Sequence, residues 1–176
     1  MPAQHPPYDA SADPLELTVV VPVYNEEEVL PLLVARLRPV LEATGAAYEV
    51  LAVDDGSSDA SPVLLQRFRR EWPALRVVRL RANAGHQAAI SAGLVRARGR
   101  YVVTIDADLQ DPPEAIARML EVARTEEVAV VYGVRTDRSS DTAFKRSTAR
   151  AYYRVMRGVS GRHVVDTWST RVASFR

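Results

Sequence analysis

Cysteine is absent from the 176-residue sequence, which excludes a disulfide framework, a thiolate zinc site and a cysteine nucleophile. Long hydrophobic runs are also missing, because the longest, 17–23 and 128–134, fall far short of the roughly 20 residues of a membrane span. The three histidines, at positions 5, 86 and 163, are too widely separated to form a metal-ligand motif. The first 14 residues have neither the basic start nor the apolar stretch of a signal peptide, so we expect a disordered leader and a cytoplasmic protein.

What the sequence does contain is the composition of one ordinary globular domain, 47% hydrophobic and 26% charged. Its net charge of +1 conceals an asymmetry. Residues 1–133 carry 13 arginines and no lysine against 19 acidic residues, a net charge of −6, whereas residues 134–176 carry ten bases against three acids, a net charge of +7. This basic segment contains the single lysine, Lys145, and suits a diphosphate ligand or an anionic membrane surface. We expect no nucleic-acid partner, because the 19 acids of residues 1–133 oppose one and no nucleic-acid-binding motif accompanies the basic segment.

Apolar runs rich in β-branched residues alternate with helical patterns, which predicts βαβ units and a mostly parallel sheet. The expected strands cover 17–23, 48–53, 75–80, 100–105 and 128–132. Three of the helices between them have start signals, namely Asn25, Ser61 followed by Pro62, and Asp111 followed by Pro112. Pro39 is expected to help end the first helix, and two further helices are expected over 86–98 and 142–158.

Polar residues gather directly after three of the expected strands, in the segments 22–26, 54–59 and 106–111. In an open α/β sheet, the loops beyond the carboxyl ends of the strands line one crevice, where ligands bind. We therefore expect the three polar clusters to converge on one site.

Asp106 and Asp108 flank an alanine at the end of the fourth expected strand. Two neighbouring carboxylates repel each other unless a cation accompanies them, and carboxylate oxygens suit Mg²⁺ or Mn²⁺, which take further oxygens from a diphosphate. Two solvated capping acids are the alternative interpretation, but the position directly after a strand favours the metal.

Asp54 and Asp55 precede a tight turn, and a carboxylate there could accept hydrogen bonds from a base or from the hydroxyls of a ribose. Capping of the turn without any ligand is the preferred interpretation for Asp59. Tyr24 either stacks on a nucleobase or packs over the strand end. His86 lies near a helix N-terminus, which disfavours its cationic form, so we expect a capping or loop role.

Several segments occur in an order typical of one enzyme family: VVVPVYNEEEVL, VDDGSSD, NAGHQAAISAGL, TIDADLQDPPE and VYGVRTDR, followed by FKR and YYRVMRG. Together they resemble family 2 glycosyltransferases, most of all bacterial polyprenyl-phosphate glycosyltransferases similar to dolichol-phosphate mannosyltransferase. The resemblance covers about residues 17–166. It implies an α/β fold of the GT-A type, a Rossmann-like three-layer sandwich around a mostly parallel sheet, over residues 15–176.

The resemblance also implies roles for individual residues. The nucleotide is bordered by Pro22, Tyr24, Glu26, Asp54 and Asp55, with Asp54 holding the base. The divalent metal, Mg²⁺ or Mn²⁺, and the diphosphate are surrounded by Asp106, Asp108 and Gln110. Bases for the donor diphosphate or the lipid phosphate are Arg135, Lys145 and Arg146. The catalytic candidates are Asp108, Arg135 and Arg146.

The implied reaction moves a sugar from a UDP- or GDP-linked donor to a polyprenyl or dolichyl phosphate in cell-envelope glycan synthesis, with inversion at the anomeric carbon. The acceptor phosphate is already an anion and needs no general base, while the metal and the arginines absorb charge on the leaving diphosphate. One face of the expected helix 142–158 is basic, which suits peripheral binding to the inner face of an anionic membrane. A surface helix whose apolar stripe packs into the core is the alternative.

The sequence departs from the family pattern near its end. Relatives tend to continue with a Gly-Asp-Phe-Arg-Leu stretch where this chain reads DTWSTRV from residue 166, and many also carry membrane-spanning helices beyond this point. We therefore expect a shortened catalytic domain. A non-catalytic nucleotide-sugar-binding or membrane-associated partner module that has lost its acceptor half remains the alternative.

Overall fold

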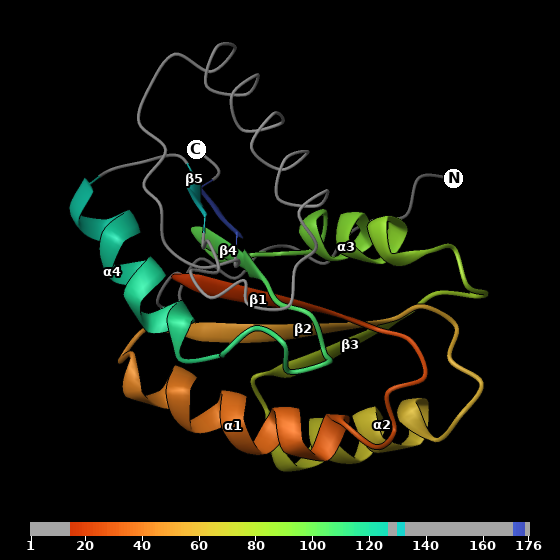
Figure 1. Cartoon of the computed structure of the whole chain (residues 1–176). Helices are drawn as coiled ribbons and strands as arrows, with labels where there is room; N and C mark the ends of the chain where they lie inside the picture. The colour runs from red at the N-terminus through yellow and green to blue at the C-terminus, as the bar shows by residue number, and fades with distance from the viewer. Residues whose placement is uncertain (1–14, 127–129, 133–170, 175–176) are drawn as a thin grey trace, which may run out of the picture.

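The computed structural model describes residues 15–126, 130–132 and 171–174. Four parallel strands, β1 (Leu17–Val23), β2 (Tyr48–Asp54), β3 (Leu75–Arg79) and β4 (Tyr101–Thr104), form most of one sheet. Two short strands, β5 (Val130–Tyr132) and β6 (Arg171–Ser174), complete it. The strand order is β3-β2-β1-β4-β6-β5, with β6 antiparallel to both of its neighbours (Figure 1). The sheet is thus mostly parallel, as predicted.

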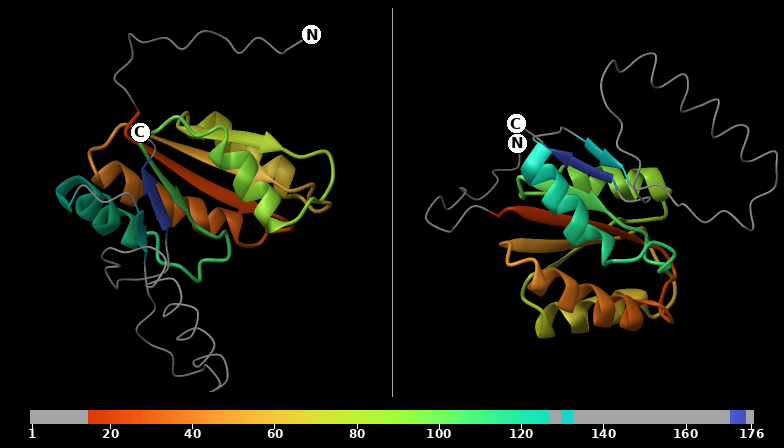
Figure 2. Two further views of the ribbon diagram at one scale, coloured as in Figure 1. Left: turned by 90° about the horizontal axis from the view of Figure 1, so that it is seen from above. Right: turned by 60° about the vertical axis from the view of Figure 1, so that its left-hand side comes forward.

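Helices cover both faces of the sheet and make a three-layer α/β sandwich. One face carries α1 (Leu30–Ala43), α2 (Ser61–Glu71) and α4 (Ala115–Glu126), and the other carries α3 (His86–Leu94) (Figures 1 and 2). Side chains of β1 alternate between the two halves of the core: Val19 and Val21 join the cluster under α1, whereas Val20 packs with Ala89 of α3. Because helices bury both faces, β1 is a continuous apolar run.

Small residues allow α3 to approach the sheet closely. Ala89 is fully buried, and a Cβ added at Gly93 would collide with the side chain of Val20. The helix ends at Leu94 rather than at residue 98. Beyond Val95 the helical hydrogen-bond pattern is lost: the Arg96 and Ala97 N–H groups donate to carbonyls only three residues back, and the Arg98 N–H donates to Glu49 Oε1 at 3.0 Å.

The predicted boundaries of α1 are wrong at both ends. Asn25 is not the N-cap: its φ is 54°, and the helix begins at Leu30 after a turn. Pro39 does not end the helix, which continues to Ala43. A proline removes one helical hydrogen bond, but the buried stripe of α1 continues on its far side with Leu41.

The start of α2 agrees with the prediction to within a residue, because Ser61 is its first residue and Pro62 lies in its first turn. The start of α4 is later than predicted, at Ala115. Pro112 is followed by a second proline, which disfavours the helical conformation, and the chain makes a turn closed by the Ala115 N–H donating to the Pro112 carbonyl at 3.0 Å.

β6 has no counterpart among the predicted strands, and the predicted helix 142–158 lies outside the described residues. None of the helices in the described ranges combines the length and apolar character that a membrane span requires.

Candidate functional site

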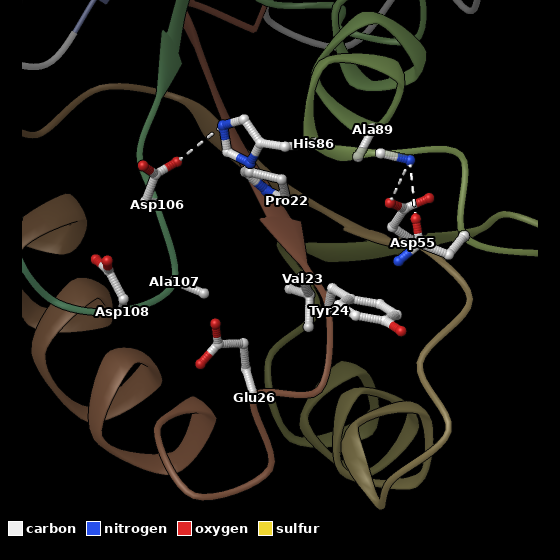
Figure 3. Close-up of a pocket in the computed structure, with 12 residues that line it drawn as sticks. Pro22, Val23, Tyr24, Glu26, Asp55, His86, Ala89, Asp106, Ala107 and Asp108 are labelled. Carbon is white, nitrogen blue, oxygen red and sulfur yellow. Dashed lines mark hydrogen bonds and ion pairs between the residues drawn. The ribbon is translucent and has the colours of Figure 1, made fainter.

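A cavity of about 240 Å³ opens at the carboxyl ends of β1, β2 and β4, where the three predicted polar clusters meet (Figure 3). The loop between β3 and α3 forms a further wall. The lining residues are Pro22, Val23, Tyr24, Glu26, Asp55, Asn83, Gly85, His86, Ala89, Asp106, Ala107 and Asp108. The predicted convergence of loops on one crevice is confirmed.

The predicted site residues fall into three sets by position. Those that line the cavity are Pro22, Tyr24, Glu26, Asp55, Asp106 and Asp108. Those described but not among the lining residues are Asp54 and Gln110. Those outside the described residues are Arg135, Lys145 and Arg146. Their roles in binding and catalysis stay predictions.

The loop after β4 presents two acids separated by one buried residue. The Ile105 N–H still donates to the Val20 carbonyl at 3.1 Å, so the chain leaves the sheet just before Asp106. Ala107 is buried beneath the loop, and Leu109 has a φ of 59°. Asp108 Oδ1 accepts the Gln110 N–H at 2.9 Å, which closes a tight Asx-type turn. Both acids therefore face the cavity from a fixed turn.

Glu26, Asp106 and Asp108 form a carboxylate cluster on one side of the cavity (Figure 3). Burial is the main reason that the pKa of Glu26 lies above its ordinary value, and the nearby carboxylates of Asp108, Asp59 and Asp106 raise it further. Burial likewise raises the pKa of Asp106. The three groups thus crowd negative charge into a partly buried space, which a cation would relieve.

His86 contacts this carboxylate cluster through Asp106. Its Nε2 lies 3.5 Å from Asp106 Oδ1, and this contact is an ion pair when the imidazole is protonated (Figure 3). The interaction opposes the rise in the pKa of Asp106 caused by burial, whereas Asp108 and Asp111 add to it. His86 begins α3 directly after Gly85, which occupies the N-cap position, so it is a wall residue rather than a cap.

The oxygen donors of the cavity fit a hard divalent cation such as Mg²⁺ or Mn²⁺. Such ions are bound by one or two protein carboxylates together with water and substrate phosphate oxygens, and Asp106 and Asp108 provide the two carboxylates. Within the described ranges, no group of three or more histidine, aspartate and glutamate side chains is arranged to hold a metal by itself. A cation here would therefore need further oxygens from a ligand.

Asp54 and Asp55 have different surroundings although they are adjacent in sequence. Asp54 is 1% exposed, accepts the Ser57 N–H at 2.9 Å and lies 3.1 Å from Nε of Arg79. Asp55 points toward the neighbouring loop, where its two carboxylate oxygens accept the N–H groups of Ala84 at 2.7 Å and Gly85 at 2.9 Å. Asp55 reaches the cavity wall and Asp54 does not.

Tyr24 lies on the side of the cavity away from Asp106 and Asp108, near Asp55 (Figure 3). Its residue is 47% exposed, so the ring is open to solvent rather than packed over the strand end. An exposed aromatic ring at a cavity rim is available for stacking on a planar ligand. Stacking of Tyr24 on a nucleobase stays a prediction.

The sequence prediction gave no binding role to the loop between β3 and α3, yet Asn83, Gly85 and His86 all line the cavity. The signal that finds them is the same one that identifies the acids, because this loop also follows the carboxyl end of a parallel strand.

The family model described as glycosyl transferase family 2 matches residues 18–175, nearly the whole chain. The chain belongs to this family.

This family 2 glycosyltransferase is similar to several curated proteins. An uncharacterized glycosyltransferase of Bacillus subtilis, YkcC, is 42% identical over 159 residues, which cover 90% of this chain and 49% of that protein. The undecaprenyl-phosphate 4-deoxy-4-formamido-L-arabinose transferase of Salmonella paratyphi B is 37% identical over 152 residues, which cover 86% of this chain and 46% of the relative. The chain spans about half the length of the curated relatives it matches.

Solved structures confirm the GT-A-like fold of the family 2 glycosyltransferase. The mannosyltransferase PcManGT of Pyrobaculum calidifontis, solved with GDP-Man and Mn²⁺, has a TM-score of 0.61 at 24% identity and covers 96% of this chain and 48% of its own. Glucosyl-3-phosphoglycerate synthase of Mycobacterium tuberculosis, solved with Mn²⁺, UDP-glucose and phosphoglyceric acid, has a TM-score of 0.65 at 21% identity, with coverages of 90% and 56%.

Proposed function

We propose that this chain carries the donor site of an inverting glycosyltransferase that moves a sugar from a UDP- or GDP-linked donor to a polyprenyl phosphate. The observation that supports this most directly is the cavity at the carboxyl ends of the strands, with Asp106 and Asp108 on one side and the ring of Tyr24 on the other. These two sides match the two halves of a nucleotide sugar, because a diphosphate needs a cation and a base stacks on an aromatic ring.

Each side of the cavity then has its own task. Tyr24 stacks on the base, while Asp55 and the loop it holds border the nucleoside. Asp106 and Asp108, with Gln110 beside them, would hold Mg²⁺ or Mn²⁺, which when bound neutralises charge on the donor diphosphate. Such an ion accompanies the nucleotide sugar in the structures of PcManGT and glucosyl-3-phosphoglycerate synthase.

The acceptor proposal rests on the Salmonella relative, whose name specifies undecaprenyl phosphate. A phosphate oxygen is already anionic, so it attacks the anomeric carbon without a general base. The bond from that carbon to the nucleoside diphosphate breaks on the opposite face, which inverts the centre. Arg135, Lys145 and Arg146 are proposed to bind the anionic phosphates, because arginine and lysine donate charge-assisted hydrogen bonds to them. A lipid acceptor also implies that the chain works at a membrane surface, which we propose is the inner face.

A thermal-shift titration tests the donor site. We expect a rise in the melting temperature of the purified chain with either UDP-glucose or GDP-mannose, present with Mn²⁺ or Mg²⁺ and lost with EDTA, because a ligand that binds only the folded state stabilises it. Asp108→Asn should remove most of that rise. Glu121→Gln, an exposed acid of α4, is the matched control and should leave the rise unchanged.

Transfer is then measured with radiolabelled donor and a polyprenyl phosphate. Formation of a lipid-linked sugar supports the whole proposal. Donor binding without any transfer would favour a nucleotide-sugar-binding module instead, and the absence of a shift with every donor would rule out the donor site.

A further inference from the structure

The loop after β1 is tied to the loop after β2 by its own backbone. Three consecutive N–H groups of residues 25–27 each donate to a side chain of the second loop. The pairs are Asn25 to Ser57 Oγ at 3.0 Å, Glu26 to Ser61 Oγ at 2.9 Å, and Glu27 to Asp59 Oδ2 at 3.1 Å. Three successive donors are thus satisfied by side chains more than 30 residues away along the chain.

The second loop is held in return. Asn25 Oδ1 accepts the backbone N–H of Ser58 at 2.9 Å, and Glu27 Oε2 accepts the backbone N–H of Ala60 at 2.7 Å. The five hydrogen bonds therefore run in both directions between the two loops. We call Ser57, Asp59 and Ser61 the loop clamp, since they supply the three side-chain acceptors.

Two of the three acceptors are buried. Ser57 is 4% exposed and Ser61 is fully buried, although both side chains are polar. A buried hydroxyl that accepts a hydrogen bond is costly to remove, because the donor it leaves behind is desolvated and unpaired. Loss of the Ser61 hydroxyl would thus remove the acceptor of the part-buried Glu26 N–H.

The side chains of residues 24–27 point alternately toward the cavity and toward the second loop. Asn25 and Glu27 turn their side chains toward the second loop, whereas Tyr24 and Glu26 line the cavity. Asn25 adopts a φ of 54°, a left-handed conformation that asparagine tolerates better than most residues but that still needs support from its surroundings. The clamp supplies that support on both sides of it.

We propose that Ser57, Asp59 and Ser61 are positioning residues of the donor site, which hold the loop 24–28 so that Tyr24 and Glu26 face the cavity. This inference rests on the proposed function, because it assigns the clamp an effect on nucleotide-sugar affinity. The clamp residues themselves are not among those that line the cavity, so they act through the loop rather than on the ligand.

The test compares hydroxyl or acceptor deletions inside and outside the clamp. Ser61→Ala removes the acceptor of the Glu26 N–H, whereas Asp59→Ala removes the acceptors of both the Glu27 N–H and the Ser61 N–H. Asp59→Asn keeps one amide oxygen, which can accept only one of those two hydrogen bonds. Thr44→Ala is the matched control, because the Thr44 hydroxyl donates to the Leu41 carbonyl at 2.7 Å at the opposite end of α1, away from both loops. If Ser61→Ala does not fold, the partly exposed Asp59 still allows the test.

Two readouts decide the outcome. Amide hydrogen exchange of residues 25–27 in the free protein should accelerate about tenfold in Ser61→Ala and Asp59→Ala, since each loses one hydrogen bond of the clamp. The dissociation constant for the donor that binds the wild type should rise by about three- to thirtyfold. Asp59→Asn should show smaller changes than Asp59→Ala in both readouts, because it keeps one acceptor oxygen, and Thr44→Ala should show neither change.

If the amide exchange rates of residues 25–27 are unchanged in Ser61→Ala and Asp59→Ala, the clamp does not hold this loop. If these rates rise but the dissociation constant for the donor is unchanged, the clamp has no positioning role in donor binding. A similar loss of affinity in Thr44→Ala would show that lower stability alone explains the effect. If the wild type binds neither UDP-glucose nor GDP-mannose, the proposed function and the role in affinity fail together. The exchange rates would still establish or refute the clamp itself.

Discussion

The carboxylate of Glu49 is buried at the end of the sheet opposite the cavity, with 2% of the residue exposed. Its oxygens accept hydrogen bonds from the Thr18 hydroxyl at 2.9 Å, from Arg76 at 2.8 Å and from the Arg98 guanidinium at 2.7 Å. Burial alone would raise the pKa of Glu49, but the hydrogen bonds from Arg98, Arg76 and Thr18 outweigh it and hold this pKa below its ordinary value. The charged form therefore stabilises the fold.

Replacing this carboxylate tests that conclusion. Glu49→Gln should lower the free energy of unfolding at neutral pH by about 2–4 kcal/mol, because it removes a buried charge from two arginines. Urea denaturation measures the change, with Glu121→Gln as an exposed control that should have little effect.

The lowered pKa of Glu49 also determines how the stability difference between the wild type and Glu49→Gln changes with pH. A carboxyl group whose folded pKa is lowered stabilises the fold fully above its unfolded pKa, near 4.5, and loses this contribution as the pH falls through the folded pKa. The stability gap between wild type and Glu49→Gln should thus stay constant from about pH 7 to pH 5 and narrow only below the ordinary glutamate pKa. A gap that narrows above pH 5 would contradict the assignment.

Gly56 lies where two loops of the cavity touch. Its φ is +72°, and a Cβ there would lie 2.6 Å from the backbone carbonyl carbon of Ala82 and 2.6 Å from the backbone nitrogen of Asn83. Gly56→Ala should therefore lower the free energy of unfolding by about 2–4 kcal/mol through backbone strain and steric collision. The control Gly45→Ala has a similar φ of +64° but open space around it, so it should cost only about 1 kcal/mol in thermal or urea unfolding. If both variants lose the same unfolding free energy, the close approach of Gly56 to the backbone of Ala82 and Asn83 does not add to the cost.

Much of the cavity could be predicted from single residues, because acids directly after β-branched runs must lie at one edge of a parallel sheet. Asp106, Asp108 and Tyr24 are found in this way. The difference between Asp54 and Asp55 could not be predicted, because it depends on which carboxylate meets the backbone of a neighbouring loop. The loop clamp could not be predicted either, because its hydrogen-bond partners are far apart in sequence. Its serine and aspartate residues are also common in ordinary turns.

At the level of elements, α1 shows how tertiary packing overrides a local signal. Pro39 is exposed and lies inside the helix, so it removes a helical hydrogen bond without contributing to the core. Pro39→Ala should therefore raise the free energy of unfolding by about 1–2 kcal/mol. Pro31→Ala is the control, because a proline in the first turn has no helical hydrogen bond to lose, and it should bring no gain. A loss of stability in Pro39→Ala by urea unfolding would contradict this account.

The central strands were predicted well and the helix ends poorly, for one physical reason. β1, β2 and β4 are buried on both faces, so hydrophobicity alone marks them. Helix ends depend on where loop N–H groups find partners, as in the turn before α1 and the turn before α4. β6 is four residues long and has no apolar run of its own, and only its pairing with β4 and β5 defines it.

At the scale of the whole molecule, the charge asymmetry of the sequence predicts membrane attraction by residues 134–176. The double variant Arg150→Glu and Arg154→Glu should reduce retention on vesicles of anionic lipid, with the largest difference at low salt, where electrostatic screening is weak. The variant Arg67→Glu and Arg69→Glu, on α2, changes the net charge equally and should retain more binding. Sedimentation with the vesicles measures this, and equal losses would attribute binding to net charge alone.

The position of β6 has a consequence for how the chain is made. β4 pairs with β1 on one side and with β6 on the other, and β5 joins the sheet through β6. During synthesis, β1 to β4 can assemble with their helices while β4 still presents an open edge, because residues 171–174 emerge from the ribosome much later. An open edge of this kind invites pairing with another nascent chain. Pairing of β6 with β4 covers that edge. We therefore expect aggregation to compete with folding mainly before β6 has paired.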